Sequence, residues 1–282
     1  MHSITLPAYA KINLTFSILG TLPNGYHSVE TIMQKISLAD TVTISPADKT
    51  TVSCGMDIPI EKNLAYKAAL LFFELYKKEI PVRIDILKKI PEGSGMGGGS
   101  ADAATVLVGL NQITGNPFSM EFLEEKSVSL GADVPFLIRS STALCTGIGE
   151  IITPINPKLD SCAFLIVKPE ASKSTAHIYA EYDSFSPKPM PADTNRMVNA
   201  IQKKDFHQIG NCLSNAFEPM MGQKVPDILS IKNALLSAGA LGSIMTGSGT
   251  AVYGLFPSLE KAEKAKRLFE NTNYKTFTAV PV

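Results

Sequence analysis

A glycine-rich stretch is the part of the sequence best suited to bind a phosphate. Five of the eleven residues from Pro91 to Ala101 are glycine, although the 20 glycines among 282 residues are close to the usual frequency. Glycine accepts positive φ angles and lets a ligand come close to the backbone. A run of backbone N–H groups aimed at a helix N-terminus binds phosphate. The alternative interpretation is a flexible surface turn.

The residues on either side of this stretch predict a strand before it and a helix after it. The segment 81–86 (PVRIDI) alternates polar and apolar residues, which is typical of a half-buried strand. After Ser100, alanine and leucine recur at helical spacing, and Ser100 is the expected N-cap of that helix. The order strand, glycine loop, helix favours phosphate binding over a surface turn.

Two known nucleotide-loop patterns can be compared with the stretch. The Walker pattern requires a lysine before the hydroxyl residue, whereas a glycine precedes Ser100. Gly93, Gly95 and Gly98 have the spacing of the dinucleotide-binding fingerprint. Glu121 follows at an acceptable distance for the acidic residue of that fingerprint, so a nucleotide-binding oxidoreductase is an alternative function. A phosphate loop without its own lysine needs a cation from elsewhere, with or without Mg²⁺.

Lys11 is the candidate for that cation. It lies with Asn13 in the otherwise apolar segment 8–14 (AYAKINL), which is predicted to be part of a strand. The alternative is a lysine that simply faces solvent, as most lysines do.

Asp133 is the candidate catalytic carboxylate. It follows a predicted helix over 119–130 and lies among apolar residues in the segment 131–136 (GADVPF). Because Pro135 disfavours a helical conformation of Val134, the sequence predicts that Asp133 is held on a short rigid turn. A carboxylate there is able to accept a proton from a substrate hydroxyl. The alternative is a turn aspartate that bonds to its own backbone.

The turn predicted at 23–27 (PNGYH) presents Tyr26 next to His27. A tyrosine ring can stack on a planar ring, and an imidazole can form hydrogen bonds to its edge. The alternative is an ordinary turn aromatic that packs on the edge of the core.

Composition excludes several classes of protein. The net charge is zero, so there is no electrostatic signature of nucleic-acid or membrane binding. The chain has 45% hydrophobic residues and no apolar run long enough to span a membrane. The four cysteines are scattered, and the first residues lack the pattern of a signal peptide. We therefore expect a cytoplasmic enzyme with reduced thiols and a small-molecule substrate.

The order of the predicted elements favours an α+β fold, because strands and helices segregate more than they alternate. Strands are expected at 4–6, 12–19, within 30–43, two within 142–152, and at 162–167, 241–246, 251–256 and 276–280. Helices are expected over 64–78 with Asn63 as N-cap, over 119–130 with Ser119 as N-cap, from 174, and over 194–217, 226–238 and 258–269. The proline-containing segment 154–160 predicts a boundary between domains 1–155 and 156–282.

Several of these stretches together resemble one family. The segment 91–104 resembles the glycine-rich motif of the GHMP kinases, which include galactokinase, homoserine kinase, mevalonate kinase and phosphomevalonate kinase, and 245–249 (MTGSG) resembles their C-terminal glycine motif. The segments 8–14, 25–27 and 131–136 resemble the family members that act on a cytidine diphosphate-linked methylerythritol. The resemblance spans nearly the whole chain.

This resemblance implies a fold and an activity. The fold is a two-domain α+β GHMP kinase fold with the active site in the interdomain cleft. The activity is transfer of the γ-phosphoryl group of ATP, with Mg²⁺, to the 2-hydroxyl of the methylerythritol moiety in non-mevalonate isoprenoid precursor synthesis. A monomer or weak homodimer is expected.

The resemblance also implies roles for individual residues. Asp133 is implied to be the catalytic carboxylate, as a base or as a group that orients the hydroxyl, and Lys11 its cationic partner. No residue is assigned as a metal ligand. ATP contacts are implied for Asn63, Lys88, Pro91, Glu92, Gly93, Ser94, Gly95, Met96, Gly97, Gly98, Gly99, Ser100 and Ala101. Substrate contacts are implied for Asn13, Tyr26, His27, Thr175 and Tyr179.

The sequence departs from the family pattern at a few places. Met96 replaces a common leucine, which conserves volume, and 171–175 differs from the usual approach to the Ser-Thr pair. Asp102 lies close to the expected phosphate, so it either points away or reaches Mg²⁺. Two further alternatives are a GHMP kinase for another small alcohol and an inactive ligand-binding relative. Tyr26 and His27 argue against the first, and the presence of Lys11 and Asp133 argues against the second.

Overall fold

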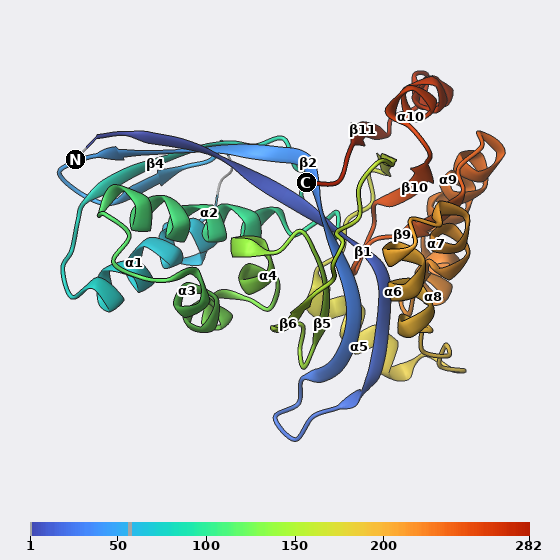
Figure 1. The fold of residues 1–282 in the computed structure, drawn as a ribbon, viewed down its shortest axis with the longest axis horizontal. Helices are drawn as coiled ribbons and strands as arrows, with labels where there is room; N and C mark the ends of the chain where they lie inside the picture. The colour runs from blue at the N-terminus through green and yellow to red at the C-terminus, as the bar shows by residue number, and fades with distance from the viewer. Residues whose placement is uncertain (1, 56–57) are drawn as a thin grey trace. The chain divides into compact units, whose positions relative to one another are not determined.

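The structure is a computed structural model that describes residues 2–55 and 58–282. Met1, the first residue of the predicted domain 1–155, and residues 56–57 lie outside the described part. The chain forms two compact units (Figure 1). Unit 1 comprises residues 1–10, 39–90 and 97–140, and unit 2 comprises residues 11–38, 91–96 and 141–282. The glycine-rich stretch therefore contributes its first half to unit 2 and its second half to unit 1.

Unit 1 is a layer of helices packed on a layer of strands. Its strands are β3 (Thr51–Ser53), β4 (Val82–Leu87), the beginning of β1 (Ile4–Thr21) and the end of β2 (His27–Pro46), in the order β3-β4-β2-β1. Its helices α1 (Leu64–Tyr76), α2 (Gly98–Ile113), α3 (Met120–Ser127) and α4 (Asp133–Arg139) lie on one side of these strands (Figure 1). The 3₁₀ turns η1 (Ile60–Lys62) and η2 (Val128–Leu130) precede α1 and α4.

Unit 2 contains the rest of β1 and β2 and a second sheet. Parallel pairing joins β1 to β8 (Ser214–Asn215), and antiparallel pairing joins β2 to β5 (Thr142–Thr146) and β5 to β6 (Ile151–Pro154). The second sheet is antiparallel, in the order β11 (Lys275–Ala279), β7 (Ala163–Lys168), β10 (Val252–Phe256), β9 (Gly242–Met245). The helices of this unit are α5 (Thr175–Ser184), α6 (Thr194–Gln202), α7 (Phe206–Cys212), α8 (Glu218–Lys224), α9 (Pro226–Ser237) and α10 (Leu259–Lys266), followed by η3 (Arg267–Phe269).

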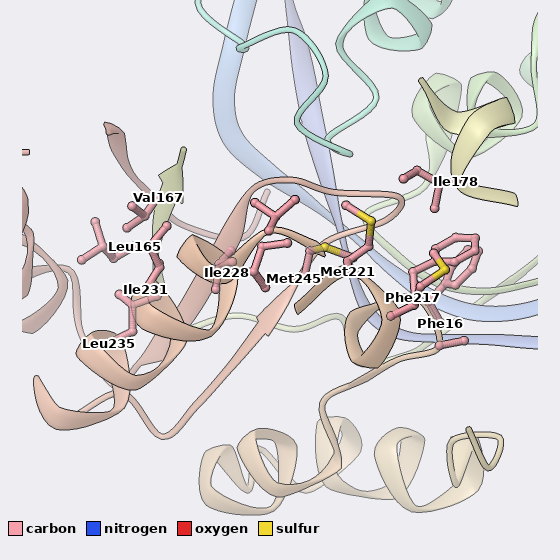
Figure 2. Close-up of a cluster of buried hydrophobic side chains, with 14 of the residues drawn as sticks. Phe16, Leu165, Val167, Ile178, Phe217, Met221, Ile228, Ile231, Leu235 and Met245 are labelled. Carbon is pink, nitrogen blue, oxygen red and sulfur yellow. The ribbon is translucent and has the colours of Figure 1, made fainter. Parts of the chain in front are cut away.

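An apolar cluster in unit 2 joins helices α8 and α9 to the second sheet (Figure 2). Ile228 and Leu235 of α9 are buried in the same cluster as Leu165 of β7. At another part of the cluster, the ring of Phe217 stacks on Phe16 of β1 with 5.3 Å between centroids. Burial of large apolar side chains of this kind is the main favourable contribution to folding.

Most elements predicted from the sequence are present, and the α+β class is confirmed. Asn63 and Ser119 cap α1 and α3 as predicted, accepting from the N–H groups of Ala65 at 2.9 Å and Phe122 at 3.2 Å. Among the described residues, no helix has the length and apolar character needed to cross a membrane.

Two element predictions need correction. The two strands expected at 4–6 and 12–19 are one continuous strand, β1, in which residues 8–17 are buried apart from the half-buried Tyr9. The segment 194–217, predicted to be mainly helical, divides into α6, α7 and β8. The break after α6 includes Lys204 at a φ of 54°, a left-handed conformation that ends a helix.

Candidate active site

The glycine loop adopts a conformation that requires glycine. Gly93, Gly95 and Gly97 have φ values of 55°, 76° and 70°. A Cβ on Gly95 would lie 2.1 Å from the carbonyl oxygen of Thr246, which is far inside contact distance. Left-handed residues that alternate with residues of other conformation turn successive backbone N–H groups toward a common concave side, as in anion-binding nests.

Helix α2 begins at Gly98 and has Gly97 as its N-cap, so the prediction that Ser100 caps this helix is wrong. Ser100 lies in the first turn because the glycines before it take helical geometry at no steric cost. Within the described part of the chain no side chain caps the helix. The backbone N–H of Ala101 makes the first intrahelical bond, to the carbonyl of Gly97 at 2.8 Å. The first N–H groups of α2 lack an intrahelical partner and carry the positive end of the helix dipole, which suits a phosphate.

The second glycine motif, Thr246–Gly249, packs directly on the first half of the loop in unit 2. The N–H of Thr250 donates to the carbonyl of Gly93 at 3.1 Å. A Cβ on Gly247 would lie 2.7 Å from the carbonyl oxygen of Gly95. The two glycine motifs, distant in sequence, therefore need glycine at their contact for the same reason: each backbone occupies the space of the other's missing Cβ.

Lys11 is buried, with 4% of its surface exposed, so the alternative of a solvent-facing strand lysine is wrong. Its backbone N–H donates to the carbonyl of Met96 at 3.1 Å, immediately before the cap of α2. Its ammonium donates to Oδ1 of Asn13 at 2.8 Å. Asn13 in turn donates to Thr31 at 2.8 Å, and its backbone N–H donates to Oγ1 of Thr246 at 3.0 Å. This network fixes the position of the Lys11 ammonium.

Asp133 is the first residue of helix α4, so the prediction of a rigid turn with an extended Val134 is wrong. Pro135 lies in the first helical turn, where the missing N–H would have no intrahelical partner. The N–H of Val134 donates to the carbonyl of Gly131 at 3.1 Å. A carboxylate in the first turn of a helix is stabilised by the helix dipole. A Cβ on Gly131 would lie 3.8 Å from Oγ of Ser100, so this loop of unit 1 borders the first turn of α2.

Lys88, a predicted ATP contact, has its ammonium between two buried carboxylates. Nζ lies 2.5 Å from Asp40 and 2.7 Å from Asp102. Asp40 has no exposed surface and also accepts from the backbone N–H groups of Lys89 at 2.5 Å and Ile90 at 2.8 Å. Through these contacts Asp40 of β2 holds the connection between β4 and the glycine loop, and Lys88 joins it to Asp102 of α2. The side chain of Asp102 therefore points toward Lys88.

The charges in this cluster shift each other's pKa values. Burial lowers the pKa of Lys88, but the two carboxylates more than offset this effect and raise it, so the ammonium stays charged. Burial raises the pKa of Asp102 to about 7, against the opposing effect of Lys88 and with a contribution from Asp40. Oδ1 of Asp102 is buried and has no hydrogen-bond partner within the described residues. The pKa of Asp102 therefore lies well above that of an exposed aspartate.

Asn63, the other predicted adenosine-side residue, lines a cavity of about 310 Å³ in unit 1. The cavity is also lined by Val52, Ser53, Cys54, Gly55, Ile58 and Ile60. Nδ2 of Asn63 contacts the sulfur of Cys54 at 3.6 Å, while its oxygen caps α1. The wall combines the apolar side chains of Val52, Ile58 and Ile60 with the polar side chains of Ser53 and Asn63. Such a mixture is suited to a heterocycle that has hydrogen-bonding edges.

The predicted substrate residues of unit 2 fall into two groups. Tyr26 is 60% exposed on its turn, whereas His27 is stacked on Tyr179 with 4.7 Å between ring centroids. Nε2 of His27 lies 2.7 Å from Oδ1 of Asp183. Separately, Oγ1 of Thr175 lies 3.0 Å from Oγ of Ser248 in the second glycine motif.

Comparison with known proteins shows which family this chain resembles. Residues 63–141 match the GHMP kinases N terminal domain and residues 197–275 match the GHMP kinases C terminal domain. The chain is 41% identical over 269 residues to 4-diphosphocytidyl-2-C-methyl-D-erythritol kinase of Lachnoclostridium phytofermentans, covering 94% of this chain and 92% of that protein. It is 41% identical over 276 residues to the kinase of the same name from Pelotomaculum thermopropionicum, with 96% and 95% coverage.

This chain belongs to the GHMP kinase family, in its 4-diphosphocytidyl-2-C-methyl-D-erythritol kinase branch. A crystal structure of 4-(cytidine 5'-diphospho)-2C-methyl-D-erythritol kinase superposes with a TM-score of 0.81 at 28% identity, covering 99% of this chain and all of that one. Homoserine kinase from Cytophaga hutchinsonii shares the fold, with a TM-score of 0.78 at 21% identity over 100% of this chain and 95% of its own. Membership of the GHMP kinases excludes the oxidoreductase interpretation of Gly93, Gly95 and Gly98.

Three residues that contact the candidate site residues were given no role from the sequence, although Thr246 lies within the 245–249 motif. Asp40 accepts a hydrogen bond from the backbone N–H of Ile90, at the start of the loop. Thr246 accepts from the backbone N–H of Asn13, and Asp183 lies within hydrogen-bond distance of His27. Asp40 has a weak signal, because it is an isolated acidic residue in an apolar strand segment. Asp183 has none, because an aspartate near a helix end is ordinarily exposed.

Proposed function

We propose that this chain transfers the γ-phosphoryl group of ATP to the 2-hydroxyl of 4-diphosphocytidyl-2-C-methyl-D-erythritol, with Lys11 and Asp133 as its catalytic residues. The observation that carries the proposal is the glycine loop. Its N-terminal half bonds to the backbone of Lys11 in unit 2, and its C-terminal half forms the uncapped start of α2 in unit 1. Asp133 borders the first turn of that same helix through Gly131.

The proposed chemistry is a direct displacement. The substrate 2-hydroxyl oxygen forms a bond to the γ-phosphorus as the bond to the β,γ-bridging oxygen breaks, and ADP leaves. Asp133 accepts the hydroxyl proton or its hydrogen bond. The ammonium of Lys11 stabilises the charge of the transferring phosphoryl group, while the loop N–H groups hold the remaining phosphates. No covalent enzyme intermediate is required.

Mg²⁺ is expected to enter this reaction with ATP. Among residues 2–55 and 58–282, no group of three His, Cys, Asp or Glu side chains is placed to hold a metal ion. The residues fit a Mg²⁺ carried mainly by the nucleotide's phosphates, which is a common way for proteins to hold this ion. When bound, it neutralises phosphate charge in the transition state.

Tyr26, His27 and Tyr179 are proposed to form the cytidine side of the substrate site. The support is the ring stack of His27 on Tyr179 in unit 2, next to the exposed ring of Tyr26. Asn63 and its cavity are proposed to take the adenine base, with Lys88 close to the loop. Asn13 is proposed to position Lys11 as well as to face substrate. We further propose a cytoplasmic location, since the four described cysteines form no disulfide with one another. A monomer or weak homodimer is proposed from the family resemblance.

The test is ADP release in the presence of ATP and Mg²⁺. The acceptor is 4-diphosphocytidyl-2-C-methyl-D-erythritol, and the control acceptor is methylerythritol phosphate without the cytidylyl group. We expect turnover with the first acceptor only. Turnover with homoserine or mevalonate instead would contradict the substrate assignment. Asp133→Asn should retain the fold by circular dichroism and lose turnover; near-normal activity would remove Asp133 from the mechanism.

A further inference from the structure

His27 is held in one orientation by contacts from helix α5. Its side chain is 11% exposed, although it follows an exposed turn. One ring face stacks on Tyr179 at 4.7 Å with an interplanar angle of 29°. Tyr179 is itself fixed edge-on against the buried ring of Phe217, with centroids 4.9 Å apart. The imidazole therefore has little freedom to rotate, and its two nitrogens face different surroundings.

The contact with Asp183 determines which nitrogen carries the proton. Nε2 lies 2.7 Å from Oδ1 of Asp183. An ionised carboxylate only accepts hydrogen bonds, so Nε2 must be the protonated nitrogen. In the neutral ring Nδ1 is then the acceptor, since a neutral imidazole has one N–H. No described residue is recorded as a hydrogen-bond partner of Nδ1 of His27, so its lone pair is not already used by one of them.

The backbone that carries the Asp183 carboxylate is held by Lys188, which follows α5. Asp183 lies in the last turn of α5, and Lys188 donates to its backbone carbonyl at 3.2 Å. The same ammonium donates to the carbonyl of Tyr182 and lies 4.1 Å from the centroid of its ring. The Asp183 side chain is 56% exposed, so it can be replaced without opening a cavity.

We propose that Asp183 is a specificity-determining positioning residue, because it keeps Nδ1 of His27 an acceptor for the exocyclic amine of a cytosine base. Cytosine has an amino donor at the position where uracil has a carbonyl acceptor. A lone pair on Nδ1 is complementary to the amine and repels the carbonyl. This inference rests on the proposed cytidine site, and it adds the group that makes the site reject uridine.

The tautomer is tested directly by two-bond ¹H–¹⁵N NMR on protein with labelled histidine. The chain has four histidines, and the His27 signals are those that disappear in His27→Gln. We expect the Nε2–H form in the wild type and a mixture of forms in Asp183→Ala. A wild-type protein with Nδ1–H, or identical spectra in both proteins, would overturn the proposal whatever the enzyme's substrate.

Selectivity is tested with the methylerythritol diphosphate linked to cytidine or to uridine. We expect the ratio of the two kcat/KM values to fall at least about tenfold in Asp183→Ala, which corresponds to one lost hydrogen bond. In Asp183→Asn the ratio should stay at the wild-type value if the NMR spectrum shows the Nε2–H form. It should fall if the spectrum shows a mixture of forms. The control is Asp85→Ala, which removes an exposed carboxylate paired with Arg83 and should keep the wild-type ratio.

The two proposals fail in distinguishable ways. If the wild type phosphorylates neither acceptor, the proposed function fails and the selectivity inference fails with it, even if the tautomer is as expected. If the wild type prefers the cytidine-linked acceptor and Asp183→Ala keeps that preference, the function stands and the role of Asp183 is wrong. An equal loss of activity on both acceptors, with unchanged selectivity, would likewise assign Asp183 a structural role only.

Discussion

The backbone N–H of Lys11 donates to the carbonyl oxygen of Met96 at 3.1 Å. Met96 is the residue before Gly97, the N-cap of α2. The buried lysine is thus connected through one hydrogen bond and one peptide bond to the helix terminus that we assign to the ATP phosphates. We propose that this lysine supplies the charge that the loop itself lacks.

Replacing Lys11 tests this assignment. Lys11→Ala is expected to lower kcat about 10³-fold or more, because it removes a positive charge from the transferring phosphoryl group. The measurement is steady-state ADP release at saturating ATP and acceptor. Asn13→Ala is the companion variant, since it removes the partner of the ammonium but keeps the charge. It should be impaired less than Lys11→Ala, and the reverse order would contradict a direct role for the lysine.

Gly95→Ala is expected to destabilise the protein and to raise the KM for ATP. The added Cβ would lie 2.1 Å from the Thr246 oxygen, and φ is 76°. The matched control is Gly115→Ala, at a φ of 86° with no atom within 4 Å of the added Cβ. The free energy of unfolding of the control should fall by only about 1 kcal/mol, which is the cost of a side chain at a positive φ. Urea denaturation should show a larger decrease in the free energy of unfolding for Gly95→Ala than for the control. Equal decreases would mean that the two glycine motifs do not pack as described.

Asn63→Ala separates capping from nucleotide binding. It should cost about 1 kcal/mol in the free energy of unfolding, because the N-cap of α1 is lost. Ser119→Ala removes the equivalent cap of α3 and should cost a similar amount. Only Asn63→Ala should also raise the KM for ATP, since Asn63 alone of the two lines the unit 1 cavity. An unchanged KM in Asn63→Ala would remove this cavity from the nucleotide site.

Asp102→Asn should change how stability depends on pH. The pKa of Asp102 is about 7 in the folded protein against an ordinary value of 3.8. Between these values the folded state binds more protons than the unfolded state, so this group makes the wild type less stable as the pH rises from about 4 to about 7. Asparagine does not titrate. The free energy of unfolding of Asp102→Asn relative to wild type should therefore increase between pH 5 and pH 8, by on the order of 2 kcal/mol.

Chemical denaturation at several pH values provides this measurement. Asp85→Asn is the control, because Asp85 is an exposed strand carboxylate paired with Arg83. Its stability difference from wild type should stay nearly constant over the same range. If the Asp102→Asn curve runs parallel to the wild-type curve, Asp102 does not have the raised pKa described for it.

Local signals in the sequence were sufficient for much of this protein. The alternating residues of β4, the caps Asn63 and Ser119 and the glycine excess at 91–101 depend on neighbours a few positions away, so they can be read directly. The positions of Ser100 and Asp133 relative to their helices were predicted wrongly. In both cases a local rule, a serine cap or the residue before proline, was overridden by glycine conformations and by a proline tolerated in the first helical turn.

The sequence by itself determined the glycine-rich loop, the α+β class and, through a set of motifs in order, the kinase family. Only the tertiary structure decided which side chains hold the site in place. Thr246 contacts Asn13 across 233 positions and Asp183 contacts His27 across 156. Such pairs have no periodicity or spacing in the sequence, because they form only when packing of apolar side chains such as Phe16 and Phe217 has brought distant strands and helices together.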